Sequence, residues 1–379
     1  MSDFPKSEYQ ARLKRAQTQM AQKGFDAILL TTEVEFTYFA GFFTQFWQSP
    51  TRPWFLLLPA HGDPIAVIPG IGEPLMRTTW VSDIRTWSAP NLSVDGIDVL
   101  RDAIIEIIGK SGKLALPSGM ETHLRMPAND LAQLQQVIAP IACVWDEGIT
   151  RDLRIVKSSS EIERIENSCA IAGRAFDRVG EIVREGTTKS QIFRNFQMLC
   201  LEEGADAVPY LAGGIGPYGY SDVISPADDQ AISKGDVLML DTGLVSNRYF
   251  CDFDRNFVLG TANDIVADAH KKLIEVTNFV ISEIKAGMSC AEIYRKLAGA
   301  LNSSDGVGRM GHGLGLHLTE WPSIMPDEDF ILHENMVMTI EPSIDTVDGL
   351  MLVHEENIVI TATGCRQLTP YSSNEITRL

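Results

Sequence analysis

Five acidic or imidazole residues in the C-terminal half constrain this chain most strongly. All five follow apolar strand-like runs, precede them, or stand in glycine-flanked turns: Asp241, Asp252, His312, Glu341 and Glu355. A single acid in such a setting is ordinarily a cap or an ion-pair partner. A buried ionised group is costly unless it is paired or binds a metal. Five such residues therefore predict a fold that brings distant strands together around one polar pocket.

The residue types in this set indicate a metal centre. Carboxylates with one imidazole suit Mn, Co, Zn or Fe better than copper or an iron–sulfur cluster. Four carboxylates are enough to hold two divalent ions ~3.5–4 Å apart, a pair that activates water and stabilises an oxyanion in the transition state. We therefore expect two divalent metal ions as cofactors.

Composition excludes several classes of partner. The 379 residues carry 50 Asp and Glu against 32 Lys and Arg, a formal net charge of -18. This balance argues against nucleic acids and anionic membrane surfaces as partners. The sequence shows no apolar run of membrane-spanning length and no secretory signal, and its six cysteines are far apart, so we expect reduced thiols and a cytoplasmic location.

Hydrophobic patterning divides the chain into an α/β domain, residues 1–152, and a second domain, residues 153–379. Ser160 and Glu163 fit a capping box that opens a long amphipathic helix. The glycine-rich segment 212–220 is expected to be a flexible wall of the pocket. The other expected elements are helices at 7–23, 97–108, 190–203, 263–286 and 290–302, and strands at 25–32, 54–58, 65–68, 113–116, 237–242, 249–258, 336–342 and 351–361.

The order of the motifs resembles the pita-bread superfamily, which includes methionine aminopeptidase, prolidase, aminopeptidase P and creatinase. The matching features are two Asp residues separated by ten others, Gly311-His-Gly-Leu-Gly315, Ile340-Glu-Pro342, and Glu355 six residues before Thr361. Leu153–Lys157 with Glu161-Ile162 resembles the family's inter-domain junction. The resemblance covers essentially the whole chain and implies a creatinase-like α/β N-terminal domain before an α+β pita-bread catalytic domain.

The same resemblance implies roles for individual residues. The metal ligands would be Asp241, Asp252, His312, Glu341 and Glu355, with Asp252 and Glu355 bridging two ions. The position of Thr361 selects Glu355 over Glu356. Glu341 would also carry protons. The family layout further implies a homodimer in which the N-terminal domain reaches the partner's active site.

Several positions depart from the peptidase pattern. Thr319 occupies the place of a peptidase histidine, and His317, two residues earlier, either substitutes for it or packs. Val223 occupies the place of a second histidine. Asp254-Arg255-Asn256 replaces Thr-Arg-Thr, and Asp254 is either a sixth ligand or an ion-pair partner of Arg255. Both missing imidazoles would otherwise hold the scissile carbonyl.

Glu320-Trp-Pro322 is similar to a motif of a dimethylsulfoniopropionate lyase in the superfamily. We therefore take Glu341, His317 and Glu320 as candidate catalytic residues. Candidate substrate contacts are Arg52, which suits a carboxylate, Trp47, Tyr220 and Thr319.

The main functional hypothesis is a metal-dependent hydrolase of the Xaa-Pro dipeptidase or aminopeptidase type that cleaves a C–N bond. The alternative is a non-peptidase enzyme acting on a small osmolyte-like substrate, as creatinase, ectoine hydrolase or the lyase does. A catalytically silent binding module is disfavoured because all five ligand positions are present.

Overall fold

A computed structural model describes residues 4–49, 52–91, 95–301 and 308–379. It divides into two compact units, Met1–Arg154 and Ile155–Leu379. Each unit is described by itself. None of the described helices is both long enough and apolar enough to cross a membrane.

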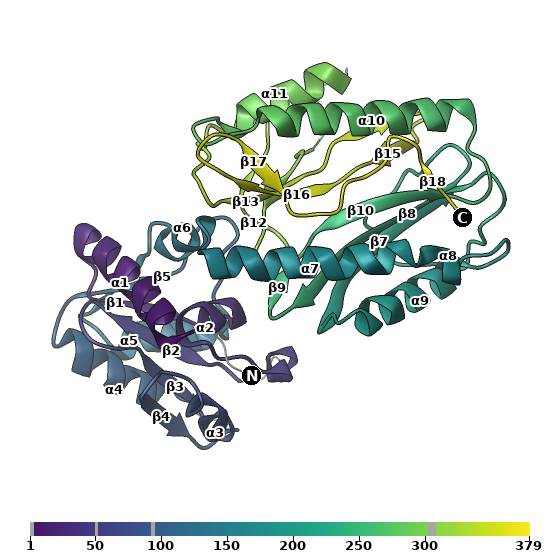
Figure 1. The fold of residues 1–379 in the computed structure, drawn as a ribbon. Coiled ribbons are helices and arrows are strands. Elements are labelled where there is room, and N and C mark those ends of the chain that lie inside the picture. Colours follow the sequence, from purple (N-terminus) through teal and green to yellow (C-terminus); the bar gives the residue numbers. More distant parts are fainter. Residues whose placement is uncertain (1–3, 50–51, 92–94, 302–307) are drawn as a thin grey trace. The chain divides into compact units, whose positions relative to one another are not determined.

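The N-terminal unit is built on one mixed six-stranded sheet (Figure 1). Its strand order is β4-β3-β2-β1-β5-β6, with β1 antiparallel to β2 and parallel to β5. The three strands β1, β2 and β3 are buried along their whole length, because helices cover the sheet. The strands are β1 (Ala27–Leu30), β2 (Phe55–Pro59), β3 (Ile65–Pro69), β4 (Asp83–Trp87), β5 (Lys113–Leu116) and β6 (Ala142–Trp145).

Local sequence features define the helices of this unit. Thr32 opens α2 with a capping box in which Glu35 returns the hydrogen bond. The helices are α1 (Lys6–Lys23), α2 (Glu33–Ala40), α3 (Glu73–Met76), α4 (Ile97–Ile108), α5 (Ala128–Val137) and α6 (Ile149–Ile155), with short 3-10 turns η1 (Gln45–Gln48) and η2 (Gly70–Gly72).

The C-terminal unit contains two five-stranded sheets and a two-stranded ribbon. One sheet has the order β18-β10-β8-β7, with β9 paired to β8, and the other has the order β12-β11-β13-β16-β17. Their strands are β7 (Ala207–Gly216), β8 (Val237–Ser246), β9 (Tyr249–Phe250), β10 (Phe253–Val258), β11 (His312–Gly313), β12 (Glu320–Ser323), β13 (Val337–Ile340), β16 (Glu356–Ile360), β17 (Cys365–Gln367) and β18 (Thr377–Arg378). The ribbon is β14 (Ser343–Asp345) with β15 (Met351–Val353).

Two pairs of helices cover these sheets. In Figure 1, α7 and α9 run along β7 and β8, whereas α10 and α11 lie together over the yellow strands near the C-terminus. Apolar side chains of α10 and α11 form one core cluster with Met338, Ile340 and Ile358 of β13 and β16. The helices are α7 (Ser159–Asp177), α8 (Val179–Ile182), α9 (Lys189–Glu202), α10 (Asp264–Glu283) and α11 (Cys290–Leu301). The predicted fold class, an α/β unit followed by an α+β unit, is confirmed.

Most of the glycine-rich segment, residues 212–216, is part of a strand and not a flexible loop. Residues 207–216 form β7, which pairs with β8 in a long antiparallel ladder. A side chain at Gly213 would collide with the carbonyl oxygen of Met239. The glycines are therefore required by close approach of two strands, a use that the sequence pattern alone does not separate from loop flexibility.

The long helix α7 begins two residues earlier than expected. Ser158, not Ser160, is its N-cap: its hydroxyl accepts from the N–H of Glu161, and the Glu161 carboxylate accepts from the N–H of Ser158. Three consecutive serines made the N-cap ambiguous in the sequence. Only the backbone, which is extended at Ser158 and helical afterwards, resolves it.

Ser158→Ala should lower the free energy of unfolding of the C-terminal unit by about 1 kcal/mol, because removal of the Ser158 hydroxyl leaves a helix N–H group without its acceptor. Ser160→Ala, inside the first turn, is the matched control and should change it by less than about 0.5 kcal/mol. Urea denaturation followed by circular dichroism measures both. Equal losses in the two variants would contradict the assignment of the cap.

Candidate metal centre

The five acidic and imidazole residues lie within or beside strands of the C-terminal unit. Asp241 lies within β8, and Asp252 lies in the turn between β9 and β10. His312 opens β11, Glu341 follows β13 directly, and Glu355 directly precedes β16. Each sheet thus contributes part of the set, β8 and β10 on one side and β11, β13 and β16 on the other.

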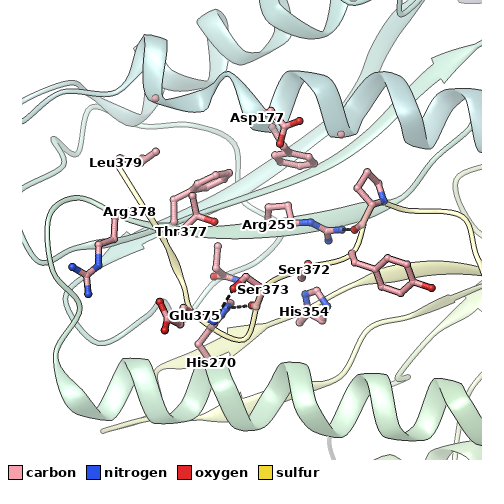
Figure 2. Close-up of a pocket in the computed structure, with 17 residues that line it drawn as sticks. Asp177, Arg255, His270, His354, Ser372, Ser373, Glu375, Thr377, Arg378 and Leu379 are labelled. Atoms are coloured by element: carbon pink, nitrogen blue, oxygen red, sulfur yellow. Dashed lines mark hydrogen bonds between the residues drawn. The ribbon is translucent and has the colours of Figure 1, made fainter.

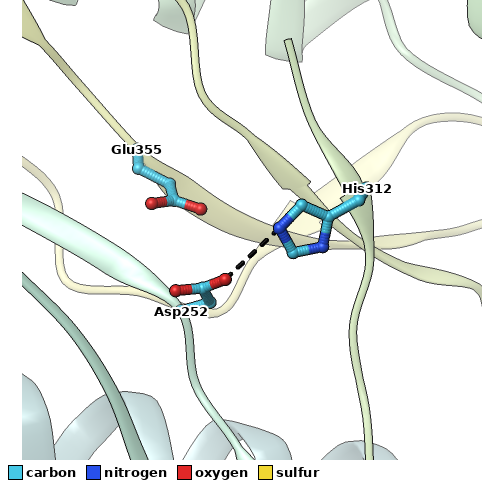
Figure 3. Close-up of side chains that lie close together, drawn as sticks. All are labelled: Asp252, His312 and Glu355. Atoms are coloured by element: carbon cyan, nitrogen blue, oxygen red, sulfur yellow. Dashed lines mark ion pairs between the residues drawn. The ribbon is translucent and has the colours of Figure 1, made fainter. Parts of the chain in front are cut away.

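Asp252, His312 and Glu355 form the centre of the arrangement (Figure 3). Each offers one ligand atom, and these atoms all lie within 4.8 Å of one another. The Asp252 Oδ2 atom is 3.3 Å from His312 Nε2, and the Glu341 Oε2 atom is 3.5 Å from the same nitrogen. All three central side chains are buried. Residues separated by more than a hundred positions therefore meet in one pocket.

The imidazole of His312 is oriented by its own main chain. Its Nδ1 atom lies 2.8 Å from the carbonyl oxygen of Gly313, which fixes Nδ1 as the protonated nitrogen. In the neutral ring, Nε2 then points a lone pair at the carboxylates of Asp252 and Glu341. Burial opposes protonation of His312, but Glu341 and Asp252 outweigh burial and raise its pKa. A neutral imidazole held by a carbonyl in this way is a common arrangement for a metal ligand.

The carboxylates repel one another in a dry environment. Burial, and then the charges of Asp252 and its acidic neighbours, raise the pKa of Asp241 and of Glu355 well above their usual values. Burial also raises the pKa of Asp252, to about 6. Among the described residues, the buried Asp241 Oδ1 and Glu355 Oε1 atoms have no hydrogen-bond partner. Acceptors without donors and a surplus of negative charge are what a bound cation would relieve.

The neighbouring Glu356 has the opposite environment. Its carboxylate is 3.1 Å from Arg255 and 3.0 Å from His354. Burial opposes its ionisation, but these two groups outweigh burial and lower the pKa of Glu356 to about 2. Adjacent residues of a strand face opposite sides, so Glu355 faces the acidic cluster and Glu356 faces its own ion pair.

The structure adds a third role for Asp254 to the two alternatives that the sequence left open. Its carboxylate accepts from the N–H of Glu355 and from the amide of Asn256. The guanidinium of Arg255 instead pairs with Glu356 and donates to the carbonyl oxygens of Asp254 and Glu355. Asp254 therefore supports the main chain at Glu355, and burial raises its pKa to about 7.

Four residues that the sequence did not single out contact the cluster. Asn357 clamps the main chain of Asp252 through both its amide atoms. Thr339 accepts from the N–H of His312 and donates to Glu341 Oε2. Burial, and then the charges of Asp241 and Asp252, raise the pKa of Tyr210, whose hydroxyl lies 3.5 Å from the carbonyl oxygen of Val223. Arg309 pairs with Glu341. Their residue types are ordinary, and only their spatial proximity marks them.

Two of the candidate residues have structural contacts. Glu320 is buried, forms a 3.0 Å ion pair with the buried Lys157, and accepts from the N–H groups of Leu316 and His317. Tyr220 is buried, and its hydroxyl joins Asn256 to the N–H of Val353. These contacts indicate that Glu320 and Tyr220 stabilise the surrounding main chain. His317 and Thr319 are half-buried.

The remaining two candidates lie in the N-terminal unit. Trp47 is buried against Phe36 and Trp54, with ring centroids 5.3 and 5.5 Å away. The Arg125 guanidinium lies over the Trp47 ring and donates to the carbonyl oxygens of Trp47 and Arg52. Trp47 is thus part of an aromatic core, whereas the role of Arg52 stays a prediction.

A cavity of about 350 Å³ lies among α7, α10 and the C-terminal segment (Figure 2). Arg255, His354 and His270 line it, with Ser372 and Ser373 of the C-terminal segment. Arg255 and His354 are the partners of Glu356, and none of the five cluster residues lines this cavity. The cavity therefore borders the side of β16 that faces away from the cluster.

The donor set fits a divalent cation. It combines one oriented imidazole with carboxylates that repel one another, two of which have an oxygen atom without a donor, and this matches the oxygen and nitrogen ligands of Mn, Co, Zn or Fe.

Comparison with known families agrees with this chemistry. Residues 163–362 match the model of metallopeptidase family M24. Residues 12–156 match the creatinase/prolidase N-terminal domain. The M24 match contains all five cluster residues.

Curated relatives point in the same direction. The chain is 30% identical over 236 residues to the Xaa-Pro dipeptidase of Pyrococcus furiosus, an alignment that covers 59% of this chain and 65% of the enzyme, just under two thirds of its length. It is 25% identical over 370 residues to the probable dipeptidase PepE of Mycobacterium tuberculosis, covering 95% of this chain and 94% of that protein.

Solved structures show the same fold. A prolidase from Thermococcus sibiricus superimposes with a TM-score of 0.87 at 22% identity over 100% of both chains. An X-Pro aminopeptidase from Thermotoga maritima gives a TM-score of 0.81 at 23% identity, covering 97% of this chain and 99% of that one. Together with the match over more than half of its length, these findings establish that the chain belongs to metallopeptidase family M24 and has the two-domain, pita-bread layout of the prolidases.

Proposed function

We propose that this protein is a metal-dependent hydrolase that cleaves the C–N bond of an Xaa-Pro dipeptide or a similar small peptide. The observation that carries the proposal is the buried cluster of Asp252, His312 and Glu355 within the M24 domain. The names of the curated relatives, Xaa-Pro dipeptidase and dipeptidase, support the substrate class.

The proposed ligands are Asp241, Asp252, His312, Glu341 and Glu355. Divalent ions held there would supply Lewis acidity and lower the pKa of water. We propose two ions, with Mn among the candidates, and a homodimer located in the cytoplasm. Metal analysis and light scattering test the ion count and the oligomeric state.

We propose that Glu341 moves a proton between the cluster and solvent. Its Oε2 atom faces His312 and Thr339, whereas its Oε1 atom faces Arg309. Its side chain is 16% exposed, against 6% for Asp252 and 2% for His312. A carboxylate that reaches both environments can accept a proton from the attacking water and return it to the leaving nitrogen.

One observation favours the alternative, a non-peptidase enzyme acting on a small osmolyte-like substrate. Thr319 and Val223 occupy the positions where peptidases of the superfamily carry imidazoles that hold the scissile carbonyl. Near these positions, the hydroxyl of Tyr210 lies 3.5 Å from the main-chain carbonyl oxygen of Val223, and the guanidinium of Arg309 donates to the hydroxyl of Thr319. Peptide turnover therefore decides between the two functions.

Glu355→Gln should weaken divalent-metal binding by more than the roughly 10–100-fold that loss of an outer-sphere partner costs. Glu356→Gln is the matched neighbour. It should retain the metal stoichiometry but lose about 3 to 5 kcal/mol of stability, because Arg255 keeps its largely buried charge without the carboxylate that neutralises it. Calorimetric Mn²⁺ titration and thermal unfolding measure the two effects. Loss of metal binding in Glu356→Gln but not in Glu355→Gln would identify Glu356 as the ligand instead.

The purified protein with added Mn²⁺ should hydrolyse Ala-Pro or Met-Pro, with release of proline followed by NMR. Asp252→Asn should be inactive, which excludes a contaminating peptidase. Metal-loaded protein that leaves every Xaa-Pro dipeptide intact would contradict the peptidase proposal and favour the small-molecule alternative.

A further inference from the structure

Hydrogen bonds hold the main chain next to Arg309 in place beside the cluster. Arg309 comes three residues before His312, in the segment that leads into β11. The next residue, Met310, donates to the carbonyl oxygen of Ile324 at 2.9 Å and accepts from the N–H of Glu341 at 3.1 Å. The main chain at Arg309 is therefore held against the strand end that carries Glu341.

The guanidinium of Arg309 contacts two residues of the site. Its Nε atom is 3.3 Å from Glu341 Oε1, and Nη2 donates to the Thr319 hydroxyl at 3.2 Å. Thr319 is the position at which the resemblance placed a peptidase imidazole. A cation thus lies against the residue that replaces that imidazole.

Exposure increases from the cluster toward this arginine. The exposed fractions of the side chains are 2% for His312, 6% for Asp252, 16% for Glu341 and 39% for Arg309. Arg309 is therefore the most exposed of these side chains, and its guanidinium is accessible to a solute while it contacts Glu341.

The charge and geometry of Arg309 suit an anionic group. Its positive charge acts on both Asp252 and His312, so it lies within electrostatic reach of the reacting region. A guanidinium has five N–H groups, and the contacts with Glu341 and Thr319 use two of them. No other acceptor for Arg309 is found in the described ranges. A planar fork with N–H groups to spare recognises a carboxylate through paired hydrogen bonds.

We propose that Arg309 is a specificity-determining residue that binds a substrate carboxylate beside the scissile C–N bond. This inference rests on the proposed hydrolase function and narrows its substrate class. In an Xaa-Pro dipeptide the free carboxylate lies directly beyond the scissile nitrogen. In a longer peptide the same position is a neutral amide, which leaves the guanidinium without its anion. The substrate is therefore a dipeptide or another small carboxylate.

The competing role for Arg309 is neutralisation of Glu341 alone. That role predicts equal effects of an Arg309 substitution on charged and neutral substrates. Carboxylate binding instead predicts an effect that depends on the substrate's charge. A comparison of Ala-Pro with Ala-Pro-amide separates the two roles.

The test measures kcat and KM for both substrates with Mn²⁺, using the wild type, Arg309→Gln, Arg309→Lys and Arg52→Ala. The wild type should prefer Ala-Pro over the amide. Arg309→Gln should reduce this preference on the order of 10- to 100-fold, the loss expected for a charge-assisted hydrogen bond, mainly through KM. Arg309→Lys should retain part of the preference, since the charge remains without the fork. Arg52→Ala should retain the preference for Ala-Pro over the amide; loss of the preference in this variant would assign carboxylate binding to Arg52 instead of Arg309.

A binding measurement separates failure of this inference from failure of the proposed function. Calorimetry of L-proline and of prolinamide with the metal-loaded protein requires no turnover. The wild type should bind proline more tightly than prolinamide, and Arg309→Gln should abolish the difference while keeping its metal content and melting temperature. Equal binding of the two ligands by the wild type, or an unchanged preference in Arg309→Gln, overturns the role of Arg309 even if peptides are cleaved.

Discussion

The structure of the C-terminal unit depends on a local electrostatic conflict. Carboxylates from two sheets converge in a buried space in which their charges raise one another's pKa and two oxygen atoms lack a donor. A fold tolerates such a cluster only when a cation or bound protons neutralise it. The surrounding contacts are arranged to hold the acids in place against this repulsion: Asn357 at Asp252, Thr339 at His312 and Asp254 at Glu355.

Glu355 and Glu356 are adjacent in the chain but have opposite electrostatic environments. Alternation places Glu355 among anions and Glu356 among cations, and their pKa values move in opposite directions as a result. One side of β16 is thus prepared for a positive ion, and the other is a closed ion pair with Arg255 and His354. Exchange of the two roles would require a one-residue shift of the strand, which the hydrogen-bonded ladder with β13 opposes.

Much of this architecture could be predicted from the sequence, for physical reasons. Long periodic helices such as α4 and α10 were readable because their apolar spacing persists over several turns. The sequence also indicated that Asp252 and Glu355 need a shared partner, because acids in apolar surroundings are costly, and in the structure both lie beside His312. The solvent exposure of individual side chains could not be predicted from the sequence. The sequence patterns indicate Trp47 and Tyr220 as substrate contacts, whereas the structure buries both side chains. Conversely, Arg309 and Asn357 acquire meaning only through neighbours distant in the chain.

Arg255 also links the last part of the chain to the catalytic region. Its guanidinium donates to the carbonyl oxygens of Glu355 and of Pro370, and beyond Pro370 the strand β18 adds to the edge of β10. Thr369 and Ser372 donate to Glu356 from the same segment. The polypeptide after Leu368 therefore acts as a brace for the strand that begins at Glu355. Frameshifts, proteolysis or bulky fusions at this end would therefore disturb the strand beside the acidic cluster, although none of the acidic residues had been altered.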